Sequence, residues 1–370
     1  MKLERFKLER YFAEHEFSAP YLLCSSDCES MEIRDLLALE PDATERFSSL
    51  RLGYTESLGA PELRRGISAL YEKISAAQVL VHAGAEEAIY NFMNIALSSG
   101  DHVIVHAPYY QSLGEVARSI GADVSEWKGN QRRKWELDLG VFKTLLTPRT
   151  KVVVINFPHN PTGFLPGLEF VQELVKLSEK HGFTIFSDEV YRGLEHDPSD
   201  RLPALADMST RAVSLGVMSK TYGLAGLRIG WIATRNSRLF NELAAFKDYT
   251  TICNSAPSEF LATLALRNSE EIVKRNLRII RNNLDHLDTF FGSHKDVFNW
   301  YRPKAGSVAF PTLLKGTAHR FCEDVVKKAG VLLLPGTLYG DGLNSVRIGF
   351  GRKNAPVAIQ RLEEYLRKTS

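Results

Sequence analysis

Residues 219–231 read SKTYGLAGLRIGW, and this segment carries the most information about the fold. Lys220 follows the apolar run Ala212–Val217, which predicts a buried strand. Glycines come after the lysine, and then Arg228. Open α/β sheets bind ligands at the carboxyl ends of their strands. Burial there lowers the pKa of an amine and makes it a nucleophile, and an arginine fork suits a phosphate. The alternative is a surface lysine and a surface arginine, which would not require the glycines around them.

Apolar runs and helical patterns alternate on both sides of this segment. Most of the runs are continuously apolar, as in strands that are buried on both faces. They lie at residues 78–82, 102–106, 151–156, 183–187, 212–217 and 228–233. Helical patterns at residues 86–97 and 167–181 stand between them. The alternation predicts an α/β fold with a mainly parallel, doubly wound sheet.

The pattern changes beyond residue 258. A long charged helix is expected at residues 259–291, short strands near 307–311 and 345–350, and a final helix at 356–368. We therefore expect a large domain at residues 45–260 and a smaller α+β domain made of residues 1–44 and 261–370.

The composition excludes several classes of protein. The 370 residues include 46 basic and 44 acidic side chains, for a net charge of +2, which gives no reason to expect a nucleic-acid or acidic-membrane partner. No run approaches the roughly 18 apolar residues of a membrane span. The four cysteines are too few and scattered for a disulfide framework or a zinc site, and reduced thiols predict a cytoplasmic protein.

Two further motifs lie where predicted strands end. Residues 156–163 read NFPHNPTG, which could be ordinary turn punctuation. Residues 186–191 read FSDEVY, and Asp188 ends an apolar run there. A buried, partnered carboxylate is expected at Asp188, and a helix cap is the alternative.

In residue type, order and spacing, these three motifs resemble those of the class I/II aminotransferases, which are fold type I enzymes that depend on pyridoxal 5′-phosphate (PLP). The resemblance extends roughly from Tyr54 to Leu366. It implies that Lys220 holds PLP as a Schiff base and moves the substrate proton. Asp188 would pair with the ring nitrogen of PLP, which serves as an electron sink. Asn160 and Tyr191 would bind its phenolic oxygen.

The resemblance also implies a set of phosphate and ring contacts. Arg228 would bind the phosphate, and Ala85 and Glu86 would donate main-chain N–H groups from the start of a helix. Tyr110 would stack on the cofactor ring, with Tyr109 as the alternative. The family often has a serine or threonine where Val217 stands, so one phosphate hydrogen bond is either missing or supplied elsewhere, with Ser219 as the candidate.

Two more matches concern the partner subunit and the substrate. Residues 52–64 resemble a segment whose tyrosine, here Tyr54, reaches the phosphate of the partner's cofactor, which implies a homodimer with shared active sites. Arg347 in SVRIGF, residues 345–350, matches the arginine that binds the substrate α-carboxylate, and Asn160 would assist it. An arginine at an exposed strand edge is the alternative.

The N-terminal part departs from the family pattern. Residues 22–29 read LLCSSDCE and lack the glycine that usually touches the substrate there. Asp27 and Glu29 could meet a basic or hydroxylated substrate side chain, and a solvated acidic loop is the alternative.

The resemblance implies transamination between an amino acid and a 2-oxo acid. A PLP-dependent lyase or cyclase of specialised amino-acid metabolism is the alternative, because fold and cofactor site do not determine the reaction. A PLP-binding sensor domain of a transcription regulator is the remote alternative. The segment before Tyr54 is expected to be too short for the DNA-binding domain that such regulators carry.

Overall fold

The computed structural model describes residues 2–369, and a seven-stranded sheet forms its centre. The strand order is β2-β8-β7-β6-β5-β3-β4. All pairs are parallel except that β8 runs antiparallel to both of its neighbours. The prediction of an α/β fold with a mainly parallel sheet is therefore confirmed. The strands are β2 (Val79–His82), β3 (His102–Ala107), β4 (Asp123–Lys128), β5 (Thr150–Asn156), β6 (Thr184–Asp188), β7 (Ala212–Val217) and β8 (Gly230–Thr234).

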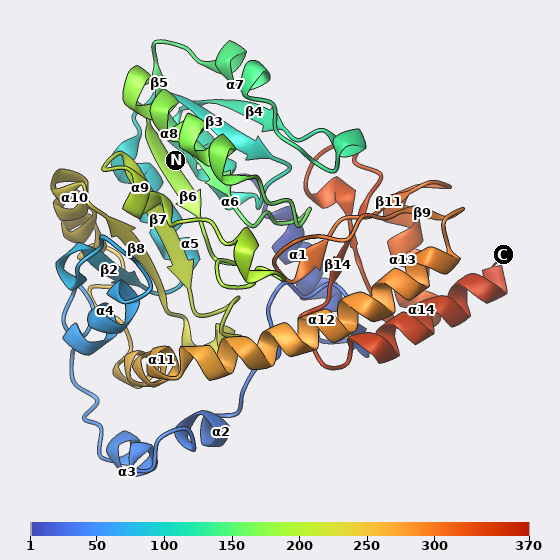
Figure 1. Cartoon of the computed structure of the whole chain (residues 1–370), viewed down its shortest axis with the longest axis horizontal. Coiled ribbons are helices and arrows are strands. Elements are labelled where there is room, and N and C mark those ends of the chain that lie inside the picture. Colours follow the sequence, from blue (N-terminus) through green and yellow to red (C-terminus); the bar gives the residue numbers. More distant parts are fainter. Residues whose placement is uncertain (1, 370) are drawn as a thin grey trace.

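Fourteen α-helices within residues 2–369 accompany the sheet (Figure 1). They are α1 (Lys7–His15), α2 (Ile33–Leu37), α3 (Ala43–Ser48), α4 (Pro61–Ser68), α5 (Ala85–Ala96), α6 (Ser112–Ile120), α7 (Leu139–Leu145), α8 (Leu168–His181), α9 (Leu205–Met208), α10 (Ser237–Lys247), α11 (Ala256–Arg267), α12 (Ser269–Ser293), α13 (Ala318–Ala329) and α14 (Ala355–Thr369).

Both faces of the central strands are buried, which explains their continuous apolar sequences. In β3, Val103 and Val105 pack with residues of α5 and α6, whereas Ile104 between them packs with residues of α7 and α8. Successive side chains of a strand point to opposite faces, so apolar residues are favoured at consecutive positions such as residues 103–105.

Two elements differ from the sequence prediction. Strand β4 was not expected, because DVSEWK is mostly polar, and it lies at the edge of the sheet where only Trp127 is fully buried. The helix expected at residues 259–291 is two helices, α11 and α12. They meet at Asn268, whose φ of −108° and ψ of 24° leave the helical range.

The remaining strands are short and lie around the C-terminal third of the chain. Strand β1 pairs in parallel with β12, so the N-terminal segment joins this part, while β14 lies between β10 and β13. The expected domain boundaries after residues 44 and 260 stay a prediction. These strands are β1 (Tyr21–Leu22), β9 (Phe298–Asn299), β10 (Val308–Ala309), β11 (Thr312–Leu313), β12 (Val331–Leu332), β13 (Leu334–Pro335) and β14 (Val346–Gly349).

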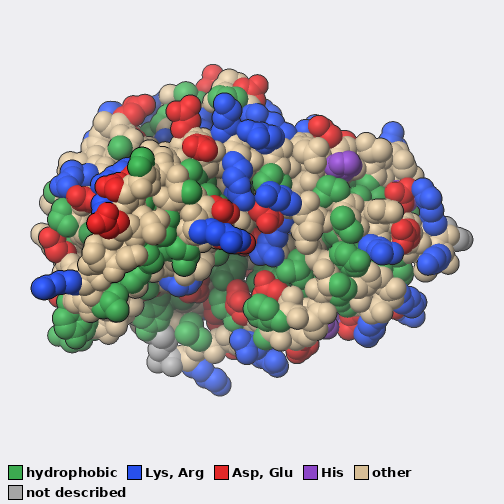
Figure 2. All heavy atoms as spheres, turned by 90° about the horizontal axis from the view of Figure 1, so that it is seen from below, with side chains coloured by type: hydrophobic (Ala, Val, Ile, Leu, Met, Phe, Trp, Pro, Cys, Tyr) green, Lys and Arg blue, Asp and Glu red, His purple; other side chains and the backbone are tan. Residues whose placement is uncertain are grey.

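The surface carries both signs of charge, in keeping with the net charge of +2. Figure 2 shows basic and acidic side chains mixed over one face, and a hollow between its larger and smaller parts. Among residues 2–369, no helix is long and apolar enough to cross a membrane.

Candidate active site

A pocket of about 410 Å³ opens where three parallel strands end. Asn156 is the last residue of β5, Asp188 is the last of β6, and Lys220 follows β7. The carboxyl ends of parallel strands meet at one edge of a sheet, which is where such folds bind ligands. The lining residues are Leu8, Glu9, Phe12, Glu16, Ser25, Ser26, Asp27, Ala85, Glu86, Ile89, Tyr110, Asn156, Asn160, Asp188, Val190, Tyr191, Val217, Ser219, Lys220, Ala225, Arg228, Arg347 and Arg352.

A larger cavity, of about 620 Å³, lies on the other side of Val190 and Val217, which line both spaces. Tyr71, Trp231 and residues of α12 surround it, and Lys220 is not among its lining residues. We assign the active site to the smaller pocket because the reactive amine, a buried carboxyl group and an arginine meet there.

Lys220 is half-buried, and its amine donates a hydrogen bond to Ser26 Oγ at 2.8 Å. Burial lowers the pKa of Lys220, while the nearby carboxylates of Asp27 and Asp188 oppose that shift. A larger fraction of the amine is therefore neutral than in water, and a neutral amine is the form that attacks a carbonyl carbon.

Asp188 is 6% exposed and lies beside Asn156 in the register of β5 and β6. Burial raises the pKa of its carboxyl group to about 7, although the Val190 N–H donates to Oδ1 at 3.2 Å. A buried carboxyl group in this state is stabilised by a cationic partner. A protonated ring nitrogen would be such a partner.

Arg347, in β14, is almost completely buried and lines the same pocket. Its Nη1 donates to Asn160 Oδ1 at 3.2 Å and also to the Tyr339 hydroxyl, and its Nη2 donates to the Cys24 carbonyl oxygen at 2.7 Å. Its Nε has no partner among residues 2–369. These contacts hold the guanidinium in place at the wall of the pocket, and a guanidinium group suits a ligand carboxylate.

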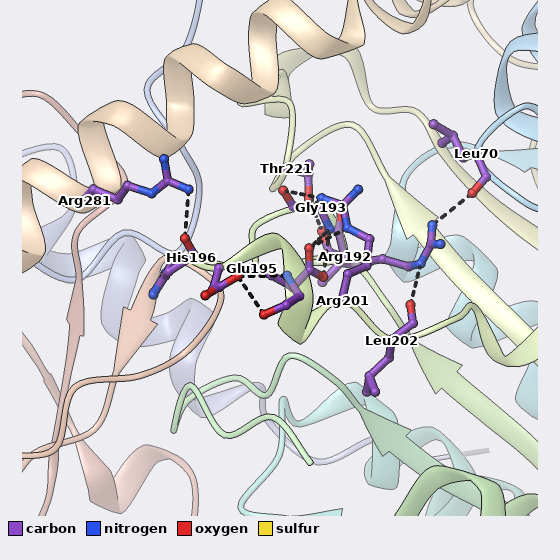
Figure 3. A network of polar contacts seen from close by, with 12 residues as sticks. Leu70, Arg192, Gly193, Glu195, His196, Arg201, Leu202, Thr221 and Arg281 are labelled. Atoms are coloured by element: carbon purple, nitrogen blue, oxygen red, sulfur yellow. Dashed lines mark hydrogen bonds and ion pairs between the residues drawn. The ribbon is translucent and has the colours of Figure 1, made fainter. Parts of the chain in front are cut away.

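The loop after β6, which carries Tyr191, is held by a polar network (Figure 3). Thr221 Oγ1 donates to the carbonyl oxygens of Val190 and Arg192, at 3.1 and 3.0 Å, so this loop is tied to the residue after Lys220. Figure 3 also shows Arg281 of α12 reaching the His196 carbonyl oxygen, at 2.8 Å. These hydrogen bonds hold the loop that carries Tyr191 against the segment that carries Lys220.

The start of α5 and Arg228 together form a site that suits a phosphate group. Gly84 precedes the helix with a φ of 89°, and a Cβ added there would lie 2.6 Å from Arg228 Nη2. Ala85, Glu86 and Ser219 also line the pocket at this end. Helix N-termini and guanidinium groups both attract anions. Glycine at position 84 leaves room for the Arg228 guanidinium beside the start of the helix, and these residues therefore fit the phosphate of PLP.

The two aromatic candidates face different spaces. Tyr110 lines the pocket and donates from its hydroxyl to Glu9 Oε1 at 3.0 Å. Tyr109 lies outside, where its hydroxyl accepts from Arg118 at 2.8 Å. Tyr54 is 93% exposed and does not line the pocket of its own chain. The stacking role of Tyr110 and the partner role of Tyr54 stay predictions.

Several pocket residues were not expected from the sequence. Helix α1 contributes three of them and the residue after it, Glu16, a fourth. Tyr339, which does not line the pocket itself, reaches Asn160 and Arg347 from the segment before β14. Arg352 holds Asp27 through two hydrogen bonds of 3.0 and 2.9 Å. These contacts join distant parts of the chain, and no local spacing signals them.

The two acidic residues noted in the N-terminal segment have different positions. Asp27 lines the pocket, whereas Glu29 accepts from the Lys353 N–H at 2.8 Å and is not among the lining residues.

The comparisons with known proteins agree with this geometry. A model of the family described as aminotransferase class I and II matches residues 21–362. Capreomycidine synthase from Streptomyces vinaceus is 30% identical over 352 residues, which cover 93% of this chain and 88% of that protein.

Two solved structures are similar over nearly their whole length. A PLP-dependent aminotransferase from Streptococcus suis has a TM-score of 0.94 and 31% identity, covering 100% of this chain and 99% of the other. The PLP-dependent cyclase OrfR has a TM-score of 0.90 and 28% identity, with the same coverage.

Proposed function

The chain belongs to the class I and II aminotransferase family, and on this basis we propose that amino-group transfer takes place in the pocket around Lys220. The protein is a PLP-dependent aminotransferase, which moves an amino group between an amino acid and a 2-oxo acid. The observation that carries the assignment of the site is that Lys220, Asp188 and Arg347 line one pocket of about 410 Å³.

We propose that two groups of residues hold the cofactor. Arg228, Ser219 and the N–H groups at the start of α5 bind its phosphate. Asp188 pairs with its ring nitrogen, and Asn160 and Tyr191 bind its phenolic oxygen. When bound, PLP supplies an electron-withdrawing ring that accepts the electron pair released at the substrate Cα.

Lys220 has the position and the protonation state for two tasks. Its amine, more often neutral than in water because burial lowers its pKa, would hold the cofactor covalently. As a free amine, Lys220 would act as the general base that takes and moves the proton of the substrate Cα. Ser26, which accepts from Lys220 Nζ at 2.8 Å, orients the amine between these tasks.

The half-reaction provides the test. PLP-loaded protein is mixed with each amino acid in turn, and the oxo acid product and the absorption of the cofactor are measured. We expect an oxo acid together with conversion of the cofactor to its amine form, and we expect Lys220→Ala to abolish both. An unchanged visible absorption band in Lys220→Ala would mean that another amine holds the cofactor.

Cyclisation is the second candidate reaction, and the observations that favour it are the similarities to a synthase and to a cyclase. The same half-reaction distinguishes the two. A cyclised amino acid formed without the amine form of the cofactor would identify the cyclase reaction. An oxo acid accompanied by that form identifies aminotransfer.

We further propose that the protein is a cytoplasmic homodimer with shared sites. Tyr54 is 93% exposed, so it is free to reach the pocket of a partner subunit. All four cysteines are free, which suits a reducing compartment.

A further inference from the structure

Helix α1 and the residue that follows it, Glu16, contribute two carboxylates to the wall of the pocket. Leu8, Glu9, Phe12 and Glu16 all line it, and their spacing of three or four residues puts them on one side of the helix. Tyr11 packs in a cluster with residues of β12 and β13, and Leu8, which lines the pocket, belongs to the same cluster. The helix is therefore anchored, with Glu9 and Glu16 at the wall of the pocket.

Every cation in the pocket already has a task. Lys220 links the cofactor, Arg228 meets the phosphate, Arg347 meets the substrate α-carboxylate, and Arg352 is held by Asp27.

Five carboxyl groups line the pocket beside these four cations. Asp27 is matched by Arg352, and Asp188 by the ring nitrogen in the proposed binding mode. Burial raises the pKa of Glu86 to about 7, and Ser112 Oγ donates to it. The carboxylates without a matching cation are therefore Glu9 and Glu16, which a neutral or acidic substrate side chain would leave uncompensated.

Glu16 is the clearest case of a pocket carboxylate that has no ion pair among the described residues. Its side chain is half-buried and forms no hydrogen bond or ion pair with any residue of the described chain. Burial raises the pKa of Glu16, even though Arg352 lies near enough to lower it. Glu9 accepts only the Tyr110 hydroxyl, at 3.0 Å, and has no cationic partner within residues 2–369.

An independent feature of the same wall also points to a ligand. Ser25 lines the pocket, is 6% exposed, and its hydroxyl has no hydrogen-bond partner in the described structure. A buried hydroxyl without a partner costs free energy, and a ligand N–H donor would relieve that cost.

We propose that the substrate is an amino acid whose side chain ends in an ammonium or guanidinium group, and that Glu9 of α1 and Glu16, the residue that follows this helix, bind this cation. The proposal rests on the proposed function, because it takes Arg347 as the anchor of the α-carboxylate. Substrate would then lie between Arg347 in β14 and the acidic side of α1.

Binding of an unreactive probe tests the proposal without turnover. The probes are 5-guanidinopentanoate and its neutral counterpart 5-ureidopentanoate, which both lack the α-amino group, and the affinity of each for PLP-loaded protein is measured by calorimetry. We expect the guanidino probe to bind at least tenfold more tightly, which corresponds to about 1.4 kcal/mol.

Two matched variants assign the preference to the pocket face of α1. Glu16→Gln keeps the shape of the side chain and removes its charge, and we expect it to lose most of the preference with the cofactor absorption unchanged. Glu14→Gln removes an exposed carboxylate of the same helix that does not line the pocket, and we expect the wild-type preference.

Equal affinity for the two probes, or equal loss of preference in both variants, would overturn the proposal. Tighter binding of succinate than of the guanidino probe would also overturn it and would indicate that Arg352 meets an acidic substrate instead. The half-reaction with L-arginine and L-citrulline distinguishes a failure of the proposed substrate class from a failure of the proposed aminotransfer. A cation preference without any oxo acid product would refute aminotransfer and leave the substrate class standing, whereas oxo acid formed equally from both would do the reverse.

Discussion

At the residue scale, the burial of Asp188 links cofactor binding to stability. Burial holds the pKa of Asp188 at about 7, compared with an ordinary value of 3.8. Between these values the unfolded chain has released its proton and the folded chain still holds it. Stability of the cofactor-free protein from this group is therefore full below pH 3.8 and is lost as the pH rises through 7.

Asp188→Asn removes the titrating carboxyl group. The difference in the free energy of unfolding between the variant and the wild type is therefore expected to change with pH. Urea unfolding of the two cofactor-free proteins should give similar free energies of unfolding near pH 4. At pH 8 the variant should be more stable, by at most about 4 kcal/mol. With PLP bound, the advantage should disappear, because the carboxylate then has a cationic partner. A difference that stays constant with pH would contradict this account of Asp188.

Arg347 provides a second prediction at the residue scale. Arg347→Ala should raise the KM for the amino-acid substrate by roughly 100-fold, because a charge-assisted, two-point contact with the carboxylate is lost. Arg347→Lys keeps the positive charge but loses the two-point contact, and its KM should lie between those of the wild type and of Arg347→Ala. Arg361→Ala, on the surface, is the control. Rates are measured over a range of substrate concentrations, and an unchanged KM in Arg347→Ala would move the carboxylate site elsewhere.

At the element scale, β14 lies against the N-terminal segment that carries Ser25 and Asp27. A Cβ added at Gly349 would be 1.8 Å from the Ser25 carbonyl oxygen, and the Gly349 N–H donates to the Leu23 carbonyl oxygen at 3.2 Å. Backbone atoms cannot yield as the end of a side chain can. This close approach sets where the acidic segment meets the pocket.

Gly349→Ala should therefore push the two segments apart. We expect a loss of about 3 kcal/mol in the free energy of unfolding, measured in urea, together with weaker substrate binding. Gly292→Ala is the matched control, because it is an exposed position of α12 with open space around it. That change should be neutral or stabilising by up to about 1 kcal/mol. Equal effects of the two changes would show that the approach of β14 does not matter.

The sequence predicted most central strands because their apolar runs record burial on both faces. It did not predict β4, since an edge strand with one partly exposed face has a polar sequence like that of a loop. The break at Asn268 was also missed, because neither glycine nor proline marks it.

At the scale of the whole molecule, the same contrast separates the predicted and the unexpected site residues. Asn160, Asp188, Tyr191 and Lys220 follow strands of one sheet, and local motifs therefore place them together. Helix α1 reaches the pocket only because Leu8 packs in one cluster with Leu332 and Leu334, from the other end of the chain. Contacts of this kind depend on tertiary packing, which no spacing in a single sequence reveals.

The expected homodimer is also a property of the whole molecule. Leu52, Tyr54 and Tyr249 are between 82% and 93% exposed. Their two segments lie side by side, since Thr55 Oγ1 donates to the Asn254 carbonyl oxygen at 3.0 Å. Large apolar side chains gathered on a surface mark an interaction site. We expect this surface to be buried against a second copy of the chain.

Sedimentation should accordingly give twice the mass of one chain. The double variant Leu52→Asp with Tyr249→Asp should be monomeric and should bind PLP weakly, because Tyr54 of the partner no longer completes the site. Tyr54→Phe should stay dimeric and bind PLP about tenfold more weakly, as expected for one hydrogen bond to a charged group. Phe17→Asp, at another exposed apolar residue, is the control and should change neither property. A wild-type protein that is monomeric and still binds PLP tightly would contradict the shared site, since each pocket would then be complete within its own chain.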